Sequence, residues 1–476
     1  MRHAATMFAA AVGLVGVLVA SSTPATANQA RTRPDDLGQG LAAAVRTAGF
    51  DELVDFETRS GGLAQPARAL PNVDVAVLEL DRSGRVTAAA NVLYDRDSPQ
   101  GFNVSLNHDT LQTQRVQFSR WRLDRWDDQA AWDQGPAQAD VLVQPGRTDK
   151  AYMASYPASV LKLMVGYGVL RLVDRGELSL GSSIRYHTVD GQSCDYGPSN
   201  PAGSDPPPSA DGATDTLAGW FDQMITVSDN FATCVLLQTL HDHHAIASTN
   251  QHLADLGLAT LRMEPSKPAV GSGWSSGTMS MGALDTAKLL LILNGRGHEL
   301  WRAPSGKAVT ASDLSPSSRR FFLRVLHEQS FHEVLDPVAL CGSTDAVQGI
   351  PARVPDRWID PDTGHVVTYD GDLQLDFGYD VRPCDADAEV TFAHKTGLTY
   401  NAGSDAGIVR ALPGKGGRWY IVAVLSNVGN RFGDPDWASA DPNACEDAPY
   451  VCYPRAFGRL GASIDQLVRG RLKHPR

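Results

Sequence analysis

A serine and a lysine lie three residues apart in the stretch SYPASVLKLMV, Ser155–Val165, which otherwise suits a buried helix. Side chains three apart share one helical face, so the Lys162 amine would lie beside the Ser159 hydroxyl. A serine hydroxyl is a weak nucleophile until a neighbouring base removes its proton. The pair therefore predicts a nucleophile and its base, and the alternative is an ordinary polar pair at a helix end.

Two further motifs follow along the chain. Ser228-Asp229-Asn230 directly precedes an apolar helical stretch, and Lys395-Thr396-Gly397 ends the strand-like run VTFAHKTG. A single S-x-x-K occurs by chance in many chains, but the order S-x-x-K, S-D-N, K-T-G is the signature of class A β-lactamases and penicillin-binding proteins. From about Val73 to its C-terminus, the chain therefore resembles the serine β-lactamase and penicillin-binding superfamily, and specifically its class A β-lactamase branch.

This resemblance implies acyl transfer through a covalent intermediate. Ser159, at a helix N-terminus, would attack a carbonyl carbon. The backbone amides of Ser159 and Leu398 would then hold the developing oxyanion. Lys162 would act as the base if burial and the positive charge of Lys395 lower its pKa, because both disfavour the ammonium form.

The resemblance also implies roles for the other motif residues. Ser228 would relay a proton to the leaving nitrogen, and Asn230 would hold a substrate amide. Lys395 and Thr396 would hold the carboxylate that penicillins and D-Ala-D-Ala ends share. Gly397 would let the substrate lie against the strand edge.

Deacylation, the hydrolysis of the acyl-enzyme, depends on one loop. Class A β-lactamases use a glutamate, in an Arg-x-Glu-Pro context followed soon by Asn, to drive water onto the acyl-enzyme. Arg262–Pro265 match this context and make Glu264 the deacylation base, although Pro268 stands in place of the Asn. In an ungapped register counted from Gly257, Lys267 and Pro268 take the Glu-Pro positions, and Glu264 is an ordinary loop carboxylate. We favour the first register, which predicts β-lactam hydrolysis.

Strand-like patterns lie towards both ends of the chain, with helical patterns between them. An alternating segment from Val73 turns at Asp81–Gly84 and predicts a β-hairpin, and strand-like runs return after about residue 388. Helical patterns dominate 159–293, and an apolar stripe that starts at Phe457 predicts a last helix. These patterns predict an α+β fold, with an antiparallel sheet built from N- and C-terminal segments and packed against a helical subdomain.

We expect one β-lactamase-like serine hydrolase domain in residues 41–476, after a signal peptide in 1–27 and a flexible lead-in in 28–40. A helix is expected near Leu41 to Ala48, just after this lead-in. Three insertions into the family pattern are expected, near residues 98–148, 190–215 and 356–390.

The N-terminus predicts export. A basic start is followed by the apolar run Met7–Ala20 and then by Ala25-Thr26-Ala27, which is typical of a secretory signal cleaved after Ala27. The run is too short for a good membrane span, so we expect a secreted monomer with no integral membrane segment after cleavage. The formal net charge of -12 and the absence of a basic run with interleaved aromatics exclude nucleic acid as an expected partner.

Six cysteines fit an oxidising compartment and predict three disulfides. They are Cys194, Cys234, Cys341, Cys384, Cys445 and Cys452. Of fifteen possible pairings we favour the sequential one, in which Cys445 bonds to Cys452 across a short loop.

Other functions fit the sequence less well. Three histidines could suggest zinc: His241, His243 and His244. Their spacing fits a solvated loop at a helix end, and we expect no metal and no cofactor. A D,D-carboxypeptidase, amidase or esterase with slow deacylation is the enzymatic alternative, and a cell-wall or glycan-binding protein on a relic fold is the non-enzyme one. The intact motifs argue against the relic.

Overall fold

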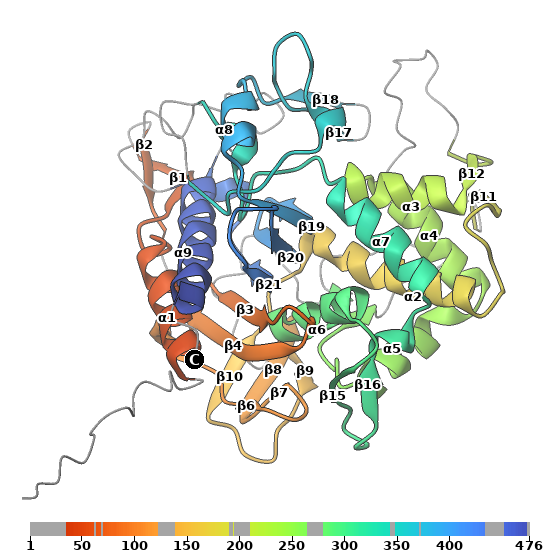
Figure 1. Ribbon diagram of the computed structural model, residues 1–476, viewed down its shortest axis with the longest axis horizontal. Coiled ribbons are helices and arrows are strands. Elements are labelled where there is room, and N and C mark those ends of the chain that lie inside the picture. Colours follow the sequence, from red (N-terminus) through yellow and green to blue (C-terminus); the bar gives the residue numbers. More distant parts are fainter. Residues whose placement is uncertain are drawn as a thin grey trace, which may run out of the picture.

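A six-stranded antiparallel sheet lies between two helical layers in the computed structural model (Figure 1). The model describes residues 35–60, 63–67, 70–121, 139–189, 194, 210–263, 279–342, 348–370, 373–433 and 452–473. In sheet order the strands are β19 (Val390–Thr399), β20 (Ala402–Ala411), β21 (Trp419–Ser426), β3 (Val73–Leu80), β4 (Val86–Asp95) and β5 (Ser98–Asn103). Because β21 pairs with β3, the N- and C-terminal segments share one sheet, which confirms the predicted α+β fold.

One face of the sheet is covered by α1 (Asp35–Thr47) and α9 (Tyr453–Lys473), which lie side by side in Figure 1. Helix α1 begins six residues before the predicted helix start at Leu41, so the part of the predicted lead-in from Asp35 onward is wrong. Leu37 and Leu41 are buried one turn apart, and this apolar stripe extends the helix towards its N-terminus. The stripe of α9 that starts at Phe457 is buried as predicted.

The other face of the sheet carries the helical subdomain. Its helices are α2 (Lys162–Asp174), α3 (Leu217–Thr226), α4 (Asn230–Asp242), α5 (Ala245–Asp255), α6 (Ala283–Asn294) and α7 (Pro316–His327). Helix α6 packs on β3 and β21, while α2 is buried among its neighbours along most of its length. Ser315 caps α7, since its Oγ accepts a hydrogen bond of 3.2 Å from the Ser318 amide.

Small sheets and short helices surround this core. The strands are β1 (Val54–Ser60), β2 (Leu63–Pro66), β6 (Leu106–Asn107), β7 (Gln112–Thr113), β8 (Val116–Trp121), β9 (Ala139–Val143), β10 (Lys150–Met153), β11 (Ser183–Arg185), β12 (Thr214–Thr216), β13 (Arg262–Met263), β14 (Met279–Ser280), β15 (Glu299–Arg302), β16 (Ala308–Thr310), β17 (Val367–Asp370) and β18 (Leu373–Asp376). The short helices are η4 (Ala158–Leu161), η6 (Ala311–Asp313), η7 (Val338–Leu340), η8 (Asp356–Trp358), α8 (Arg382–Asp387) and η9 (Asn430–Phe432). Strands β17 and β18 form a hairpin within 356–390, where one of the three insertions is predicted.

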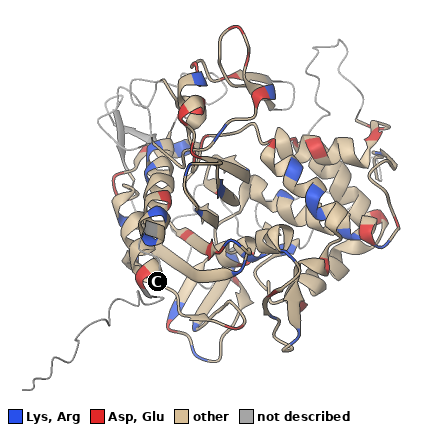
Figure 2. Ribbon diagram, viewed as in Figure 1, with Lys and Arg blue, Asp and Glu red and all other residues tan. Residues whose placement is uncertain are grey.

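Two of the three predicted disulfides are present. Cys194 bonds to Cys234, and Cys341 bonds to Cys384. The predicted partner of Cys452, Cys445, lies outside the described residues. Charges of both signs are interspersed over both helical layers (Figure 2). Among the described helices, none combines the length and the apolar character that a membrane span needs.

Candidate active site

The predicted nucleophile lies on a tight turn that is pressed against the sheet. Ser159 belongs to η4, and Ala158 before it has a φ of 46°, a left-handed conformation that costs a residue with a Cβ about 1–2 kcal/mol. Ser404 on β20 fixes the turn, because its Oγ donates a hydrogen bond of 2.6 Å to the Pro157 carbonyl. Such strain persists only where surrounding contacts hold it in place.

Strand β19 approaches this turn so closely that only glycine fits at one position. A Cβ built on Gly397 would lie 2.6 Å from the Ser159 amide nitrogen and 2.9 Å from that of Val160. These distances are shorter than any ordinary contact, so a side chain here would push strand and turn apart. The K-T-G motif thus holds its strand against the nucleophile's backbone.

Lys162 is fully buried and lies at the centre of the site. Its Nζ is 2.9 Å from Ser159 Oγ, 2.5 Å from the Ser228 carbonyl oxygen, 3.0 Å from Ser228 Oγ and 2.8 Å from Asn230 Oδ1. The carbonyl of Ser228 and Asn230 Oδ1 can only accept hydrogen bonds. A neutral amine can satisfy both with its two hydrogens and still turn its lone pair to the Ser159 hydroxyl.

Ser228 bridges two buried lysines. Lys395 Nζ lies 2.9 Å from Ser228 Oγ, opposite Lys162, and also donates to the Thr396 carbonyl at 2.8 Å. Ser228 has a φ of 58°, and Asp229 next to it caps α4 by accepting a hydrogen bond from the Ala232 amide. The cap and the left-handed turn together aim the Ser228 hydroxyl at both amines.

The structure brings together most of the predicted site residues. Those that contact one another are Ser159, Lys162, Ser228, Asn230 and Lys395. Thr396, Gly397 and Leu398 follow on β19, opposite Asp405, Ser404 and Gly403 of β20. Glu264 and Lys267, the two candidates for the deacylation position, lie outside the described residues. The sequence did not predict the part of Ser404 in fixing the turn, because a lone serine in a strand carries no local signal.

The loop histidines considered for zinc do not converge. His243 Nδ1 lies 3.3 Å from Glu177 Oε2, and His244 has a left-handed φ of 51° at the start of α5. Burial lowers the pKa of His241. Within the described residues, the group with the geometry to hold a metal is a different one: His332, Asp336 and His394.

Buried ionisable groups also lie behind β19, on the face away from Lys395. Burial lowers the pKa of His394 to about 3 and raises the pKa of Asp405 to about 8. His394 Nδ1 and Asp405 Oδ1 are 2.9 Å apart. His394 is therefore a neutral ring at physiological pH, held in one orientation.

Comparison with known proteins places this chain in a family. Residues 151–441 match the beta-lactamase enzyme family, Beta-lactamase2, and this range includes all three motifs. The chain belongs to this family. This β-lactamase-like serine hydrolase shows no match among curated proteins.

Several solved structures are similar to this family member at low identity. A beta-lactamase from Chitinophaga pinensis DSM 2588 has 17% identity and a TM-score of 0.43, over 91% of this chain and 97% of that one. A mutant of PBP-A in an acyl-enzyme complex with penicillin G has 15% identity and a TM-score of 0.46, over 93% and 97%. A class A beta-lactamase representative from Bacteroides cellulosilyticus DSM 14838 has 15% identity and a TM-score of 0.45, over 92% and 99%.

Proposed function

We propose that this protein is a secreted serine hydrolase that forms an acyl-enzyme through Ser159 and hydrolyses a β-lactam or a related amide. The observation that carries the proposal is the set of contacts around Lys162 Nζ. This atom lies within hydrogen-bonding distance of Ser159 Oγ and of two groups that can only accept, the Ser228 carbonyl oxygen and Asn230 Oδ1. A neutral Lys162 accepts the Ser159 proton, and the resulting ammonium can still donate to the Ser228 carbonyl oxygen and Asn230 Oδ1.

Acylation would then proceed in two proton transfers. Burial and the neighbouring charge of Lys395 both favour the neutral form of Lys162, which takes the proton as Ser159 Oγ attacks the carbonyl carbon. Ser228 Oγ, in contact with both amines, passes a proton to the leaving nitrogen as the ring or peptide C–N bond breaks. The amides of Ser159 and Leu398 would hold the oxyanion.

Lys395 and Thr396 would bind the substrate. Lys395 is the charged group nearest to Ser228, so it suits a substrate carboxylate, with Thr396 beside it on the same strand. Asn230 would orient a substrate amide from the other side. Penicillins and peptides that end in D-Ala-D-Ala share this carboxylate and amide arrangement.

Intact-mass spectrometry after incubation with a penicillin tests the acylation step. Wild type should gain one adduct, and Ser159→Ala should gain none. Ser155→Ala is a matched control, because it removes a buried hydroxyl four residues earlier that has no hydrogen-bond partner in the described part of the chain. An adduct that persists in Ser159→Ala would reject the nucleophile.

Turnover decides between the two candidate activities. If Glu264 activates water, nitrocefin should be hydrolysed continuously, and Glu264→Gln should accumulate acyl-enzyme. The Pro268 that replaces the family's Asn favours the second candidate, a D,D-carboxypeptidase or related amidase or esterase with slow deacylation. One stoichiometric burst that Glu264→Gln leaves unchanged would support that candidate and reject hydrolysis.

Export is a separate part of the proposal. Its support is the N-terminal pattern of a short apolar run followed by Ala-Thr-Ala. N-terminal sequencing of protein recovered from the culture medium should begin at Asn28. Recovery of the full chain from the cytoplasm alone would reject it.

A further inference from the structure

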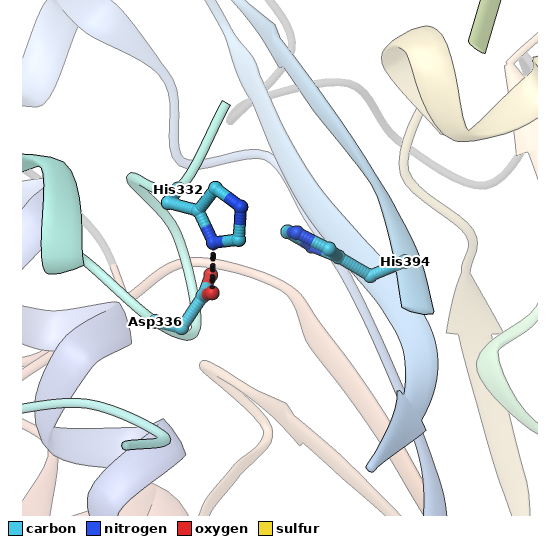
Figure 3. Close-up of side chains that lie close together, drawn as sticks. All are labelled: His332, Asp336 and His394. Carbon is cyan, nitrogen blue, oxygen red and sulfur yellow. Dashed lines mark hydrogen bonds and ion pairs between the residues drawn. The ribbon is translucent and has the colours of Figure 1, made fainter. Parts of the chain in front are cut away.

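A second cluster of chemically active side chains lies behind the K-T-G strand. His394 precedes Lys395 on β19, and successive side chains of a strand point to opposite faces. The segment that follows α7 crosses this back face and contributes His332 and Asp336 (Figure 3). The His332 and His394 ring centroids are 4.9 Å apart.

The three side chains are buried and their ligand atoms converge. His332 is 1% exposed, and Asp336 and His394 are 0% exposed. One ring nitrogen of each histidine and one carboxylate oxygen all lie within 4.8 Å of one another. Bonds of about 2.0–2.1 Å to a tetrahedral Zn²⁺ place its ligands about 3.3 Å apart, so a small inward movement would complete the site.

The outward-facing nitrogen of each histidine is already engaged. His394 Nδ1 is hydrogen-bonded to Asp405 Oδ1 at 2.9 Å, and His332 Nε2 donates to the Gln329 carbonyl oxygen at 3.0 Å. Metal-bound histidines almost always donate their other N–H to a carboxylate or carbonyl in this way. Two separate acceptors thus turn the remaining ring nitrogens, His394 Nε2 and His332 Nδ1, towards the same point.

Two of the atoms that face the centre of the cluster lack a hydrogen-bond donor in the described part of the chain. These two atoms are His394 Nε2 and Asp336 Oδ1, and both are buried. His332 Nδ1 and Asp336 Oδ2 are 2.5 Å apart, so an ion bound here would replace the hydrogen that these two atoms share. Unpaired buried acceptors destabilise the fold, and a cation among them would satisfy them.

We propose that His332, Asp336 and His394 bind one Zn²⁺ ion. Two imidazoles and a carboxylate are a known zinc donor set, and Asp336 Oδ1 supplies a fourth ligand atom. The Asp336 carboxylate would offset part of the charge of a divalent ion in this buried place. Because no position faces solvent, the ion is structural: it ties the segment after α7 to the back of β19, whose front carries Lys395.

A glycine on the adjacent strand makes room for the His394 side chain. Gly407 on β20 pairs with His394, and a Cβ there would lie 2.4 Å from His394 Cβ. Phe392 stacks on the His394 ring with centroids 4.1 Å apart and closes the cluster from the side. The ring is therefore held in place before any ion binds, which lowers the entropic cost of binding.

Metal analysis of the whole folded protein tests the proposal. After exposure to ZnCl₂ and dialysis, inductively coupled plasma mass spectrometry should give one zinc per chain for wild type. His332→Gln and His394→Gln should lose it. His365→Gln is the matched control, because His365 also pairs with a carboxylate, Asp376, at 2.9 Å but lies at the surface. Full zinc retention in His332→Gln and His394→Gln, or no zinc in folded wild type, would overturn the proposal.

A measurement on wild type alone covers the case in which the variants fail to fold. Anomalous scattering at the zinc edge from crystals of the zinc-treated protein should show one peak between His332, Asp336 and His394. A peak elsewhere, for example near His241 and His243, would overturn the assignment. Featureless density between the three side chains would show that His332 and Asp336 share a proton instead, and would equally overturn it.

Discussion

Replacement of Ser228 separates the chemistry of its hydroxyl from the strain of its backbone. Its Oγ lies 3.0 Å from Lys162 Nζ and 2.9 Å from Lys395 Nζ, so Ser228→Ala removes an atom that contacts both amines. Lys162 keeps the Ser228 carbonyl and Asn230 as acceptors, and Lys395 keeps the Thr396 carbonyl. The fold should therefore survive while the proton path is cut.

The expected loss follows from the role of the group. A positioned proton-transfer group contributes about 10²–10⁴-fold, which corresponds to about 2.7–5.4 kcal/mol of the barrier. Ser228→Gly should lose the same factor. It should also be about 1 kcal/mol more stable than Ser228→Ala, because a residue with a Cβ pays about 1–2 kcal/mol at a φ of 58° and glycine returns part of this as chain entropy.

Rapid-quench acylation by a fluorescent penicillin measures the rate, and urea unfolding measures the stability of both variants. Ser248→Ala is a control for loss of a hydroxyl, since Ser248 Oγ donates to the Ala245 carbonyl within α5. Ser228→Ala that acylates within about fivefold of wild type would refute the relay, given the 10²–10⁴ range. A wild-type acylation rate in Ser228→Gly would also refute the relay. It would show that backbone strain, and not loss of the hydroxyl, slows acylation in Ser228→Ala.

Three other perturbations follow from the same structure. Gly397→Ala would place a Cβ 2.6 Å from the Ser159 amide, so penicillin acylation, measured by gel fluorescence, should fall by at least 10²-fold, and a wild-type rate would contradict the close approach. Burial raises the pKa of Asp74 from 3.8 to about 6, so the folded chain holds this proton to higher pH than the unfolded chain does. The free energy of unfolding should therefore fall by about 2 kcal/mol as the pH rises from 4 to 7, and urea unfolding of Asp74→Asn should lack this slope. Removal of the Cys341–Cys384 bond, which closes a loop with a sequence separation of 43, should cost up to about 4 kcal/mol, and unfolding midpoints with and without reductant check it.

The sequence predicted the contacts that arise from short spacings. Ser159 and Lys162 are three apart, and helical geometry brings their side chains to 2.9 Å almost regardless of the rest of the fold. The helix after Ser228-Asp229-Asn230 was predictable for a similar reason, because an Asp before an apolar helix is a common cap. The pairing of Cys194 with Cys234 was a guess from order along the chain, and the structure confirms it.

Features that depend on long-range packing were not predictable. The start of α1 at Asp35 depends on an apolar stripe that α9, at the other end of the chain, covers. The left-handed conformations of Ala158 and Ser228 contradict local preference, since neither residue favours positive φ, and only the surrounding tertiary contacts hold them. Sequence patterns report average preferences, so functional strain is the part they miss.

The cluster of His332, Asp336 and His394 also depends on long-range packing. His332 and Asp336 are four apart and could have been paired from sequence, but His394 joins them only because β19 lies beside the segment after α7. Once β19 is placed, its period of two decides the rest: Lys395 must face the nucleophile and His394 must face the opposite side. A cation bound behind the strand would therefore restrain the backbone that presents Lys395. The reacting groups would depend on the back of the sheet even though no atom there contacts the substrate.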